Sequence, residues 1–323
     1  MKAMVYTKAG GLDTLKIREI PNPVPNDNQV MVKVKASSLN ILDYERFERD
    51  ELSLSARLTN ILQGSVGKPL GGEVSGIVVD VGKNIKHVKK GEMIYGKTLG
   101  TFPIGGWAEY ALLDKGHVFH RPSNLSFEEA AVIPIAGETA LGAVRRGKVK
   151  SGQQVMVYGA SGGVGQYAVQ LAKAVGATVT GVCSTRNIDM ARSIGCDCVV
   201  DYKCEDYRQI GKTYDVIIGV NGNNPLQEYK DLLKKDGVFV AVGAGFIPKA
   251  VLSSPFSKQI TFYGAPLMPM KDYLSYIKEL AEIGKVKPFI DKVYPIQNVT
   301  EAIKYVISKH AQGKVAIDIN FDN

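Results

Sequence analysis

A glycine-rich loop between a short strand and an amphipathic helix constrains this chain more than any other feature of its sequence. The loop, Tyr158-Gly-Ala-Ser-Gly-Gly-Val-Gly165, follows the apolar run 154–158 and opens a segment with apolar residues at helical spacing. Glycines permit a tight turn and let backbone N–H groups approach a pyrophosphate, which the positive end of the helix stabilises. The pattern predicts a dinucleotide-binding site; the alternative is a purely structural turn.

The alternation of strands and helices continues through the middle of the chain. Further strands are expected at 178–183, 198–201, 214–220, 238–242 and 259–264. Helices are expected at 163–176, with one buried stripe, at 188–194, and in a segment that continues through Lys234. Six parallel strands joined by right-handed helical crossovers form a doubly wound sheet. We therefore predict an α/β protein with a Rossmann domain over residues 123–264.

The regions on either side have a different pattern. Residues 1–122 contain β-branched runs bounded by Gly, Pro and Asn at 4–7, 30–35 and 74–81, and one helical segment at 43–62. The final segment, 265–323, contains expected helices at 271–283 and 299–308, a turn near Pro295 and a strand at 314–319. It is too short for a core of its own, so we expect it to return to the first region.

Composition excludes several classes of protein. The 323 residues are 45% hydrophobic and 22% charged, which is typical of a globular chain with two cores. No apolar run reaches the length of about 18 residues that a membrane span needs, and the first residues do not resemble a secretory signal. All four cysteines lie between residues 183 and 204, which favours reduced thiols and a cytoplasmic location. The net charge of +8 is scattered, so we expect neither a nucleic-acid nor a membrane partner.

The end of the second strand in the middle domain distinguishes NAD from NADP. An NAD site places an acidic residue there, about 20 residues after the glycine loop. This chain has Cys183-Ser-Thr-Arg-Asn187 instead, and its first carboxylate, Asp189, lies beyond the strand. Ser184, Thr185 and Arg186 can bind a 2′-phosphate, Arg186 with its charge, so we predict NADPH. The alternative is a capped helix start with an exposed arginine.

Motifs along essentially the whole chain resemble the medium-chain dehydrogenase/reductase superfamily. They are Ser38-Leu-Asn-Ile-Leu-Asp43, Gly71-Gly-Glu73, Gly106-Trp-Ala-Glu-Tyr110, Pro134-Ile-Ala-Gly-Glu-Thr-Ala140, the glycine loop, Cys183-Ser-Thr-Arg-Asn187 and Gly313-Lys314. Within it the chain is most similar to the quinone oxidoreductase branch, which includes enone-reducing homologues. The resemblance implies a GroES-like β-rich catalytic domain, formed by 1–122 and 265–323, in addition to the Rossmann domain.

The same comparison argues against zinc. The superfamily's zinc alcohol dehydrogenases carry Cys at the position of Asn40 and His at that of Gly72, and often four cysteines near 95–110, where this chain has none. Catalytic zinc needs three protein ligands, and the four histidines are spread along the chain, at His87, His117, His120 and His310. We therefore predict no metal, and an acceptor that takes hydride without a Lewis acid, namely a quinone or an α,β-unsaturated carbonyl.

The resemblance also implies site residues. Asn40 is expected near the nicotinamide, with Asp43 and Tyr44 as further catalytic candidates; from the sequence alone, Asn40 or Asp43 can equally cap a helix, and Tyr44 can be a packing residue. The other expected cofactor contacts are Thr139, Ser161, Gly162, Gly163, Val164, Ser184, Thr185, Arg186, Tyr202 (adenine), Asn223, Val242, Gly243, Ala244, Ala265, Pro266, Leu267 and Lys314 (pyrophosphate). Glu138 stands where relatives usually have an apolar residue, and its role stays open.

The leading hypothesis is a zinc-independent, NADPH-dependent reductase of quinones or activated enones. The alternatives are a 2-enoyl-thioester reductase, a catalytically inactive NADPH-binding protein and, least favoured, a zinc alcohol dehydrogenase. The expected strand 259–264 has alternating β-forming residues and would leave an unprotected sheet edge. We therefore predict a homodimer joined at that strand, as the resemblance also implies.

Overall fold

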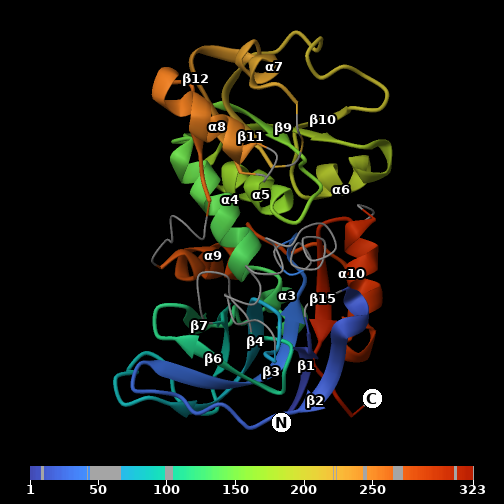
Figure 1. Ribbon diagram of the computed structural model, residues 1–323. Helices are drawn as coiled ribbons and strands as arrows, with labels where there is room; N and C mark the ends of the chain where they lie inside the picture. The colour runs from blue at the N-terminus through green and yellow to red at the C-terminus, as the bar shows by residue number, and fades with distance from the viewer. Residues whose placement is uncertain are drawn as a thin grey trace. The chain divides into compact units, whose positions relative to one another are not determined.

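The chain folds into two compact units. The computed structural model describes residues 1–8, 11–41, 43, 67–98, 105–220, 222, 224–242, 246–264, 272–308 and 311–322. The first unit consists of Met1–Ile135 and Ile290–Asn323, and the second of Ala136–Phe289 (Figure 1). The second unit is therefore an insertion in the first.

A six-stranded parallel sheet forms the centre of the second unit. Its strands are β8 (Gln154–Tyr158), β9 (Thr178–Cys183), β10 (Cys198–Asp201), β11 (Tyr214–Gly219), β12 (Leu233–Ala241) and β13 (Ile260–Phe262). They lie in the order β10-β9-β8-β11-β12-β13, and every neighbouring pair is parallel. The order reverses between β8 and β11, which is the switch point of a doubly wound sheet. The predicted Rossmann architecture is confirmed.

The helices of this unit follow the strands. They are α4 (Pro134–Arg146, which begins in the first unit), α5 (Gly165–Val175), α6 (Ile188–Ser193), α7 (Leu226–Lys230), α8 (Ile247–Ser253) and α9 (Tyr273–Glu282), with 3-10 turns η2 (Thr185–Asn187) and η3 (Ser254–Phe256). Helix α5 differs from the single buried stripe that its periodicity predicts, because all residues from Gly165 to Ala172 are buried. Its second face is covered by the chain at 287–289, to which Gln166 and Gln170 donate hydrogen bonds.

One predicted helix is wrong at its end. The helix expected to continue through Lys234 is only α7, which ends at Lys230, and residues 233–241 form strand β12. Leu233 pairs with Tyr214 of β11, and the register then shifts between Tyr214 and Val216. The residues at 234–236 are charged and exposed. Such a polar run is typical of the end of a helix, so the sequence does not indicate that the strand begins here.

The first unit is built on a mostly antiparallel sheet. Its strands are β3 (Gln29–Ser38), β4 (Glu73–Val81), β5 (Met93–Lys97), β6 (Tyr110–Asp114), β7 (Val118–His120), β14 (Ile290–Pro295) and β15 (Lys314–Asp318), in the order β14-β15-β3-β4-β5-β7, with β6 also paired to β3. A separate hairpin joins β1 (Lys2–Tyr6) to β2 (Leu15–Glu19). The helices are α3 (Phe127–Ala131) and α10 (Val299–Ile307), with turns η1 (Leu12–Thr14) and η4 (Ile296–Asn298).

The C-terminal strand closes this unit. Strand β15 pairs antiparallel with β3, so that Ala316 lies opposite Ser38. Along β3 the side chains of Val30, Val32 and Val34 are buried in alternation, as the sequence predicts. The alternation ends at Ser37 and Ser38, which are both buried, so polar groups enter the interior where β3, β4 and β15 meet.

The units divide at 135/136 and 289/290, whereas the sequence predicts boundaries after 122 and 264. Helix α3 packs on β3 and β4, and the N–H of Ile135 donates to Glu73, which joins residues 123–135 to the first unit. The side chains of Gln166 and Gln170 each donate to and accept from the backbone at Phe289 and Lys287, which ties that segment to the second unit. The helix predicted at 43–62 lies almost entirely outside the described residues.

Candidate active site

The glycine loop has the geometry that a pyrophosphate requires. Gly159 has φ +87°, a conformation that side chains disfavour, and a Cβ at Gly165 would overlap the carbonyl oxygen of Gly159. Helix α5 begins directly after the loop, at Gly165. Within the described residues, the N–H groups of Gly163 and Val164 have no backbone acceptor, so they are available to an anion at the positive end of the helix. The loop therefore fits the phosphates of a dinucleotide.

Two of the predicted cofactor contacts, Ser161 in the loop and Ser184 after β9, are joined through Asn187. The amide of Asn187 donates to the hydroxyl of Ser161 over 2.8 Å and to that of Ser184 over 3.2 Å, and all three residues are buried. Asn187 thus joins the glycine loop to the end of β9. The sequence motif contains Asn187, but its spacing does not reveal that it bridges the two serines.

An acidic residue that the sequence analysis missed lies at the same edge. The hydroxyl of Thr185 donates to the carboxylate of Asp201, at the end of β10, and this bond is the main reason that the pKa of Asp201 is lowered. The N–H of Lys203 also donates to this carboxylate, over 3.0 Å. Thr185 and Arg186 are exposed. Asp201 was not predicted because it lies on β10, whereas the acid of an NAD site is expected on β9. In the sheet, Asp201 of β10 pairs with Cys183 at the end of β9.

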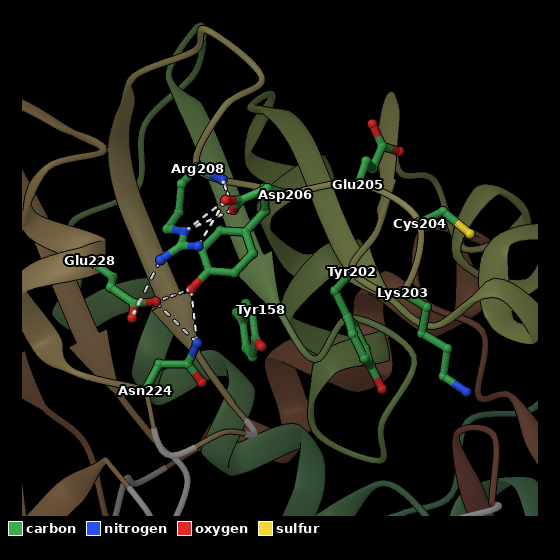
Figure 2. A pocket seen from close by; sticks show the side chains of 10 residues that line it. Tyr158, Tyr202, Lys203, Cys204, Glu205, Asp206, Arg208, Asn224 and Glu228 are labelled. Atoms are coloured by element: carbon green, nitrogen blue, oxygen red, sulfur yellow. Dashed lines mark hydrogen bonds and ion pairs between the residues drawn. The ribbon is translucent and has the colours of Figure 1, made fainter.

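A pocket of about 550 Å³ opens at the carboxyl ends of β8, β10 and β11 (Figure 2). Figure 2 shows Tyr202 and Lys203 on one side, Asp206, Arg208, Asn224 and Glu228 on the other, and Tyr158 between them. Tyr202, the residue predicted at the adenine, is half exposed. An open aromatic ring in a pocket of this size can stack on a planar base.

The far wall of the pocket is a polar network. The hydroxyl of Tyr207 donates to Glu228 over 2.8 Å, and the amide of Asn224 donates to the same hydroxyl over 3.0 Å. Arg208 makes a bidentate pair with Asp206 at 2.8 Å. Burial, followed by the bond to Glu228, raises the pKa of Tyr207 to about 12, so its hydroxyl remains a donor at neutral pH. The wall therefore presents polar groups that are already paired with one another.

A second polar cluster lies inside the first unit. The carboxylate of Glu73 is fully buried at the start of β4 and accepts hydrogen bonds from Ser38, from Asn40 over 2.8 Å and from Lys314 over 2.9 Å through Oε1. Its Oε2 accepts from the N–H of Ile135 over 2.6 Å. Four donors on one carboxylate satisfy a buried charge. Glu73 was missed as a site residue because its partners come from distant parts of the chain.

Lys314 has different partners from the pyrophosphate expected of it. Its ammonium donates to the Leu39 carbonyl over 2.8 Å, to Asn40 Oδ1 over 2.7 Å and to Glu73 over 2.9 Å. An ammonium has three donors, and all are used. The structure therefore gives Lys314 no free donor for a phosphate.

Asn40 is the half-buried member of this cluster, and Asp43 holds its backbone. The carboxylate of Asp43 accepts from the N–H of Asn40 over 2.8 Å, and the N–H of Asp43 donates to the carbonyl of Asn40 over 3.0 Å. This is only half of a capping box, because the Asp43 side chain reaches back to the Asn40 N–H but the Asn40 side chain accepts from Lys314 and not from the Asp43 N–H. Asp43 thus contacts Asn40, while Tyr44 lies outside the described residues.

The remaining predicted residues divide into described and undescribed ones. Thr139 is half buried on α4, and Val242 is buried after β12, where its N–H donates to the carbonyl of Gly219. Asn223, Gly243, Ala244, Ala265, Pro266 and Leu267 lie outside the described residues. Glu138 is fully buried on α4 and does not point to solvent; together with burial, its charge raises the pKa of Tyr263.

The cysteines are all free thiols. Cys183 and Cys196 are buried, and burial raises the pKa of Cys183 to about 11 and that of Cys196 to about 12. Cys204 is exposed in the pocket wall. Over the part of the chain that the structure describes, no three His, Cys, Asp or Glu side chains lie together in a way that could hold a metal ion. None of the helices described there is long and apolar enough to cross a bilayer.

Together, the doubly wound sheet with its glycine loop and the β-rich unit with its buried polar cluster define an oxidoreductase of the medium-chain dehydrogenase/reductase class. A family model for the alcohol dehydrogenase GroES-like domain matches residues 26–123, and one for zinc-binding dehydrogenases matches 194–317. The chain belongs to the quinone oxidoreductase branch of this superfamily.

Individual relatives cover the whole chain. The chloroplastic quinone-oxidoreductase QR1 of Triphysaria versicolor is 34% identical, over 98% of each chain. The chloroplastic NADPH-dependent alkenal/one oxidoreductase of Arabidopsis thaliana is 32% identical, over 98% of this chain and 79% of the relative. The solved structure of the quinone oxidoreductase from Coxiella burnetii has a TM-score of 0.87 and 27% identity, and 99% of each chain is covered.

Proposed function

We propose that this enzyme uses NADPH to reduce quinones or α,β-unsaturated carbonyl compounds and needs no metal. The observation that carries this proposal is the contact between Lys314 and Asn40, because the resemblance implies that Asn40 stands where the zinc alcohol dehydrogenases have a zinc ligand. The Lys314 ammonium lies 2.7 Å from Asn40 Oδ1. A positive charge at that distance repels a divalent cation, so the position favours an acceptor that takes hydride without a Lewis acid.

The cofactor half of the proposal rests on the second unit. The glycine loop fits a pyrophosphate, and the exposed residues Thr185 and Arg186 lie at the end of β9, where a 2′-phosphate would be bound. Arginine is well suited to bind phosphate because its charge and paired donors act together. An NADPH-dependent relative of 32% identity supports the same choice. Asp201 is held by Thr185 and Lys203 and so is already satisfied by protein donors.

The chain's own residues position and polarise the reactants. The bound reduced nicotinamide supplies the hydride. Asn40 has an amide that can donate to the carbonyl oxygen of the acceptor, where negative charge develops as the hydride arrives at the β-carbon or the quinone ring. The alkenal/one relative and the quinone-oxidoreductase relatives favour these two acceptor classes.

The test is the rate of cofactor oxidation by chelator-treated protein, measured with NADPH and with NADH against an ortho-quinone and a simple enone. We expect turnover of at least one acceptor, with NADPH preferred and with no loss of activity after chelation. Loss of activity that zinc restores would overturn the metal-free account. Turnover of 2-enoyl thioesters alone would favour the thioester reductase, and tight NADPH binding without turnover of any acceptor would favour the inactive binding protein.

We also propose that the enzyme is a homodimer joined at β13. Among the described residues this strand ends the six-stranded sheet, so one of its backbone edges has no neighbouring strand in that sheet order. The preceding residues Val251, Leu252 and Phe256 are exposed by 44%, 75% and 90%. Large apolar side chains beside an open strand edge favour pairing with a second copy. A cytoplasmic location is proposed on the free cysteines, which suit a reducing compartment.

A further inference from the structure

Two buried charges occupy the centre of the first unit without any role in the chemistry described so far. Glu73 is fully buried and Lys314 is 4% exposed, and they form an ion pair at 2.9 Å. A buried ion pair contributes little net stability, because desolvation of both groups offsets their attraction. In some proteins buried polar or ionic groups fix one specific arrangement of their neighbours. The neighbour shared by both charges is Asn40.

The ion pair determines the orientation of the Asn40 amide, that is, the positions of its Oδ1 and Nδ2 atoms. Lys314 can only donate hydrogen bonds and an ionised Glu73 can only accept them. Asn40 Oδ1 faces Lys314 at 2.7 Å, and Asn40 Nδ2 faces Glu73 at 2.8 Å. Rotation of the amide by a half turn would place its oxygen against a carboxylate and its NH2 against an ammonium. The two charges therefore permit one orientation and oppose the other.

This orientation leaves the second N–H of the amide with a weak partner. Asn40 Nδ2 donates to Glu73 over 2.8 Å, and its second hydrogen bond, to the Ser38 hydroxyl, is long at 3.4 Å. Because Lys314 withdraws electron density at Oδ1, the remaining N–H becomes a stronger donor. The backbone of Asn40 is also fixed, by Asp43. Asn40 is half buried, whereas Ser38, Glu73 and Lys314 are buried.

We propose that Glu73 and Lys314 are positioning residues, which lock the Asn40 amide so that its weakly held second N–H exchanges the Ser38 hydroxyl for the carbonyl oxygen of the substrate as that oxygen gains negative charge. This rests on the proposed function, since it names the group that the reductase uses to stabilise an enolate or a quinol anion. A substrate with a carbonyl oxygen can accept this hydrogen bond. Asn40 follows the end of β3, Glu73 begins β4 and Lys314 begins β15. Three neighbouring strands therefore position one amide.

The orientation is tested without turnover, by NMR of the asparagine side-chain amides in ¹⁵N-labelled protein. Asn40→Asp identifies the Asn40 signals by their loss. In the wild type we expect an inequivalent pair of hydrogens with slow exchange, and in Glu73→Gln and Lys314→Met we expect both signals to shift and to exchange faster. Ser75→Ala is the control, because Ser75 is equally buried on β4 but donates to the carbonyl of Ile94.

The consequence for catalysis is tested by kcat and KM of the same variants. We expect Glu73→Gln and Lys314→Met to lower kcat roughly tenfold to a hundredfold, as loss of an aligned donor does, with the KM for NADPH within about twofold. Lys314→Arg should recover part of the loss, because it restores a cationic donor. Ser75→Ala should keep the wild-type kcat.

The outcomes separate the two proposals. Unchanged amide signals and unchanged kcat in Glu73→Gln and Lys314→Met would overturn the positioning role, and so would an equal loss of kcat in Ser75→Ala. Glu73→Gln preserves the side-chain shape, so it decides the matter if Lys314→Met fails to fold. A wild type that binds NADPH but reduces no quinone or enone would refute the proposed function, while the amide signals would still report whether the two charges fix Asn40.

Discussion

The ammonium of Lys314 lies 2.9 Å from the carboxylate of Glu73, although 241 residues separate them in the sequence. Between them the chain leaves the first unit, forms the whole Rossmann unit and returns. The contact forms because β15 pairs with β3 and β3 pairs with β4, which brings the start of β15 and the start of β4 to the two sides of the end of β3. Two distant segments thus supply opposite charges to one buried position.

Removal of one charge of this pair should destabilise the protein more than removal of both charges. Lys314→Ala leaves the Glu73 carboxylate buried without its cation and should lower the free energy of unfolding by about 3–5 kcal/mol. The double variant Glu73→Leu with Lys314→Met removes both charges and should recover most of that loss. Urea unfolding of the cofactor-free proteins measures both. Additive losses in the double variant would show that the pair is not coupled.

Replacement of Arg186 should change cofactor preference. Because Arg186 is proposed to bind the 2′-phosphate, Arg186→Ala should weaken NADPH binding about tenfold to a hundredfold and leave NADH binding nearly unchanged. The matched control is Arg192→Ala, since Arg192 lies on α6 and pairs with Asp189 at 3.7 Å. Titration of the fluorescence of each reduced cofactor measures the affinities. An equal loss for NADPH and NADH would contradict the assignment.

Thiol reactivity should report whether the dinucleotide occupies the pocket of Figure 2. The thiolate is the reactive form, so Cys183 and Cys196, with pKa values raised to about 11 and about 12 by burial, should resist iodoacetamide at about pH 8. Cys204 is exposed in the pocket wall and should react. NADPH should slow the labelling of Cys204, as followed by peptide mass spectrometry. Cys204 labelling at the same rate with saturating NADPH would place the cofactor elsewhere.

The oligomeric state should depend on the apolar residues that precede β13. Phe256 is exposed by 90% and Leu252 by 75%, so a charge at Phe256 is tolerated by the folded subunit but opposes an apolar contact. Phe256→Asp should turn a dimer into a monomer without a change in thermal unfolding of the subunit core. Val24→Asp is the control, because Val24 is 83% exposed in the first unit. A wild-type monomer at micromolar concentration, in sedimentation analysis, would refute the dimer.

The local features of the second unit could be predicted from the sequence. Strand β8 spans the predicted residues 154–158, and α5 follows the glycine loop as expected, because glycine conformation and apolar periodicity act over a few residues. The end of β9 was also placed correctly. The error at β12 arose in the same unit, where charged residues at 234–236 begin a strand whose pairing with β11 is not visible in local patterns.

The side chains that give the site its chemistry were harder to predict. Asp201 reaches Thr185 only because β10 and β9 are neighbours, whereas the acid of an NAD site is expected at the end of β9 itself. Glu73 lies in the motif Gly71-Gly-Glu73, but its role depends on Ser38 and Asn40 at the end of β3 and on Lys314 of β15. Spacing along the chain carries little information about contacts made across a sheet.

The most direct test of the central claim is the oxidation of NADPH and of its 4,4-dideuterated form by chelator-treated enzyme, with an ortho-quinone and a simple enone in parallel. The account predicts that at least one acceptor is consumed, that deuterium slows the reaction, and that a reduced enone carries the label at its β-carbon. Consumption of neither acceptor by protein that binds NADPH would contradict it, as would reduction of the enone without transfer of deuterium.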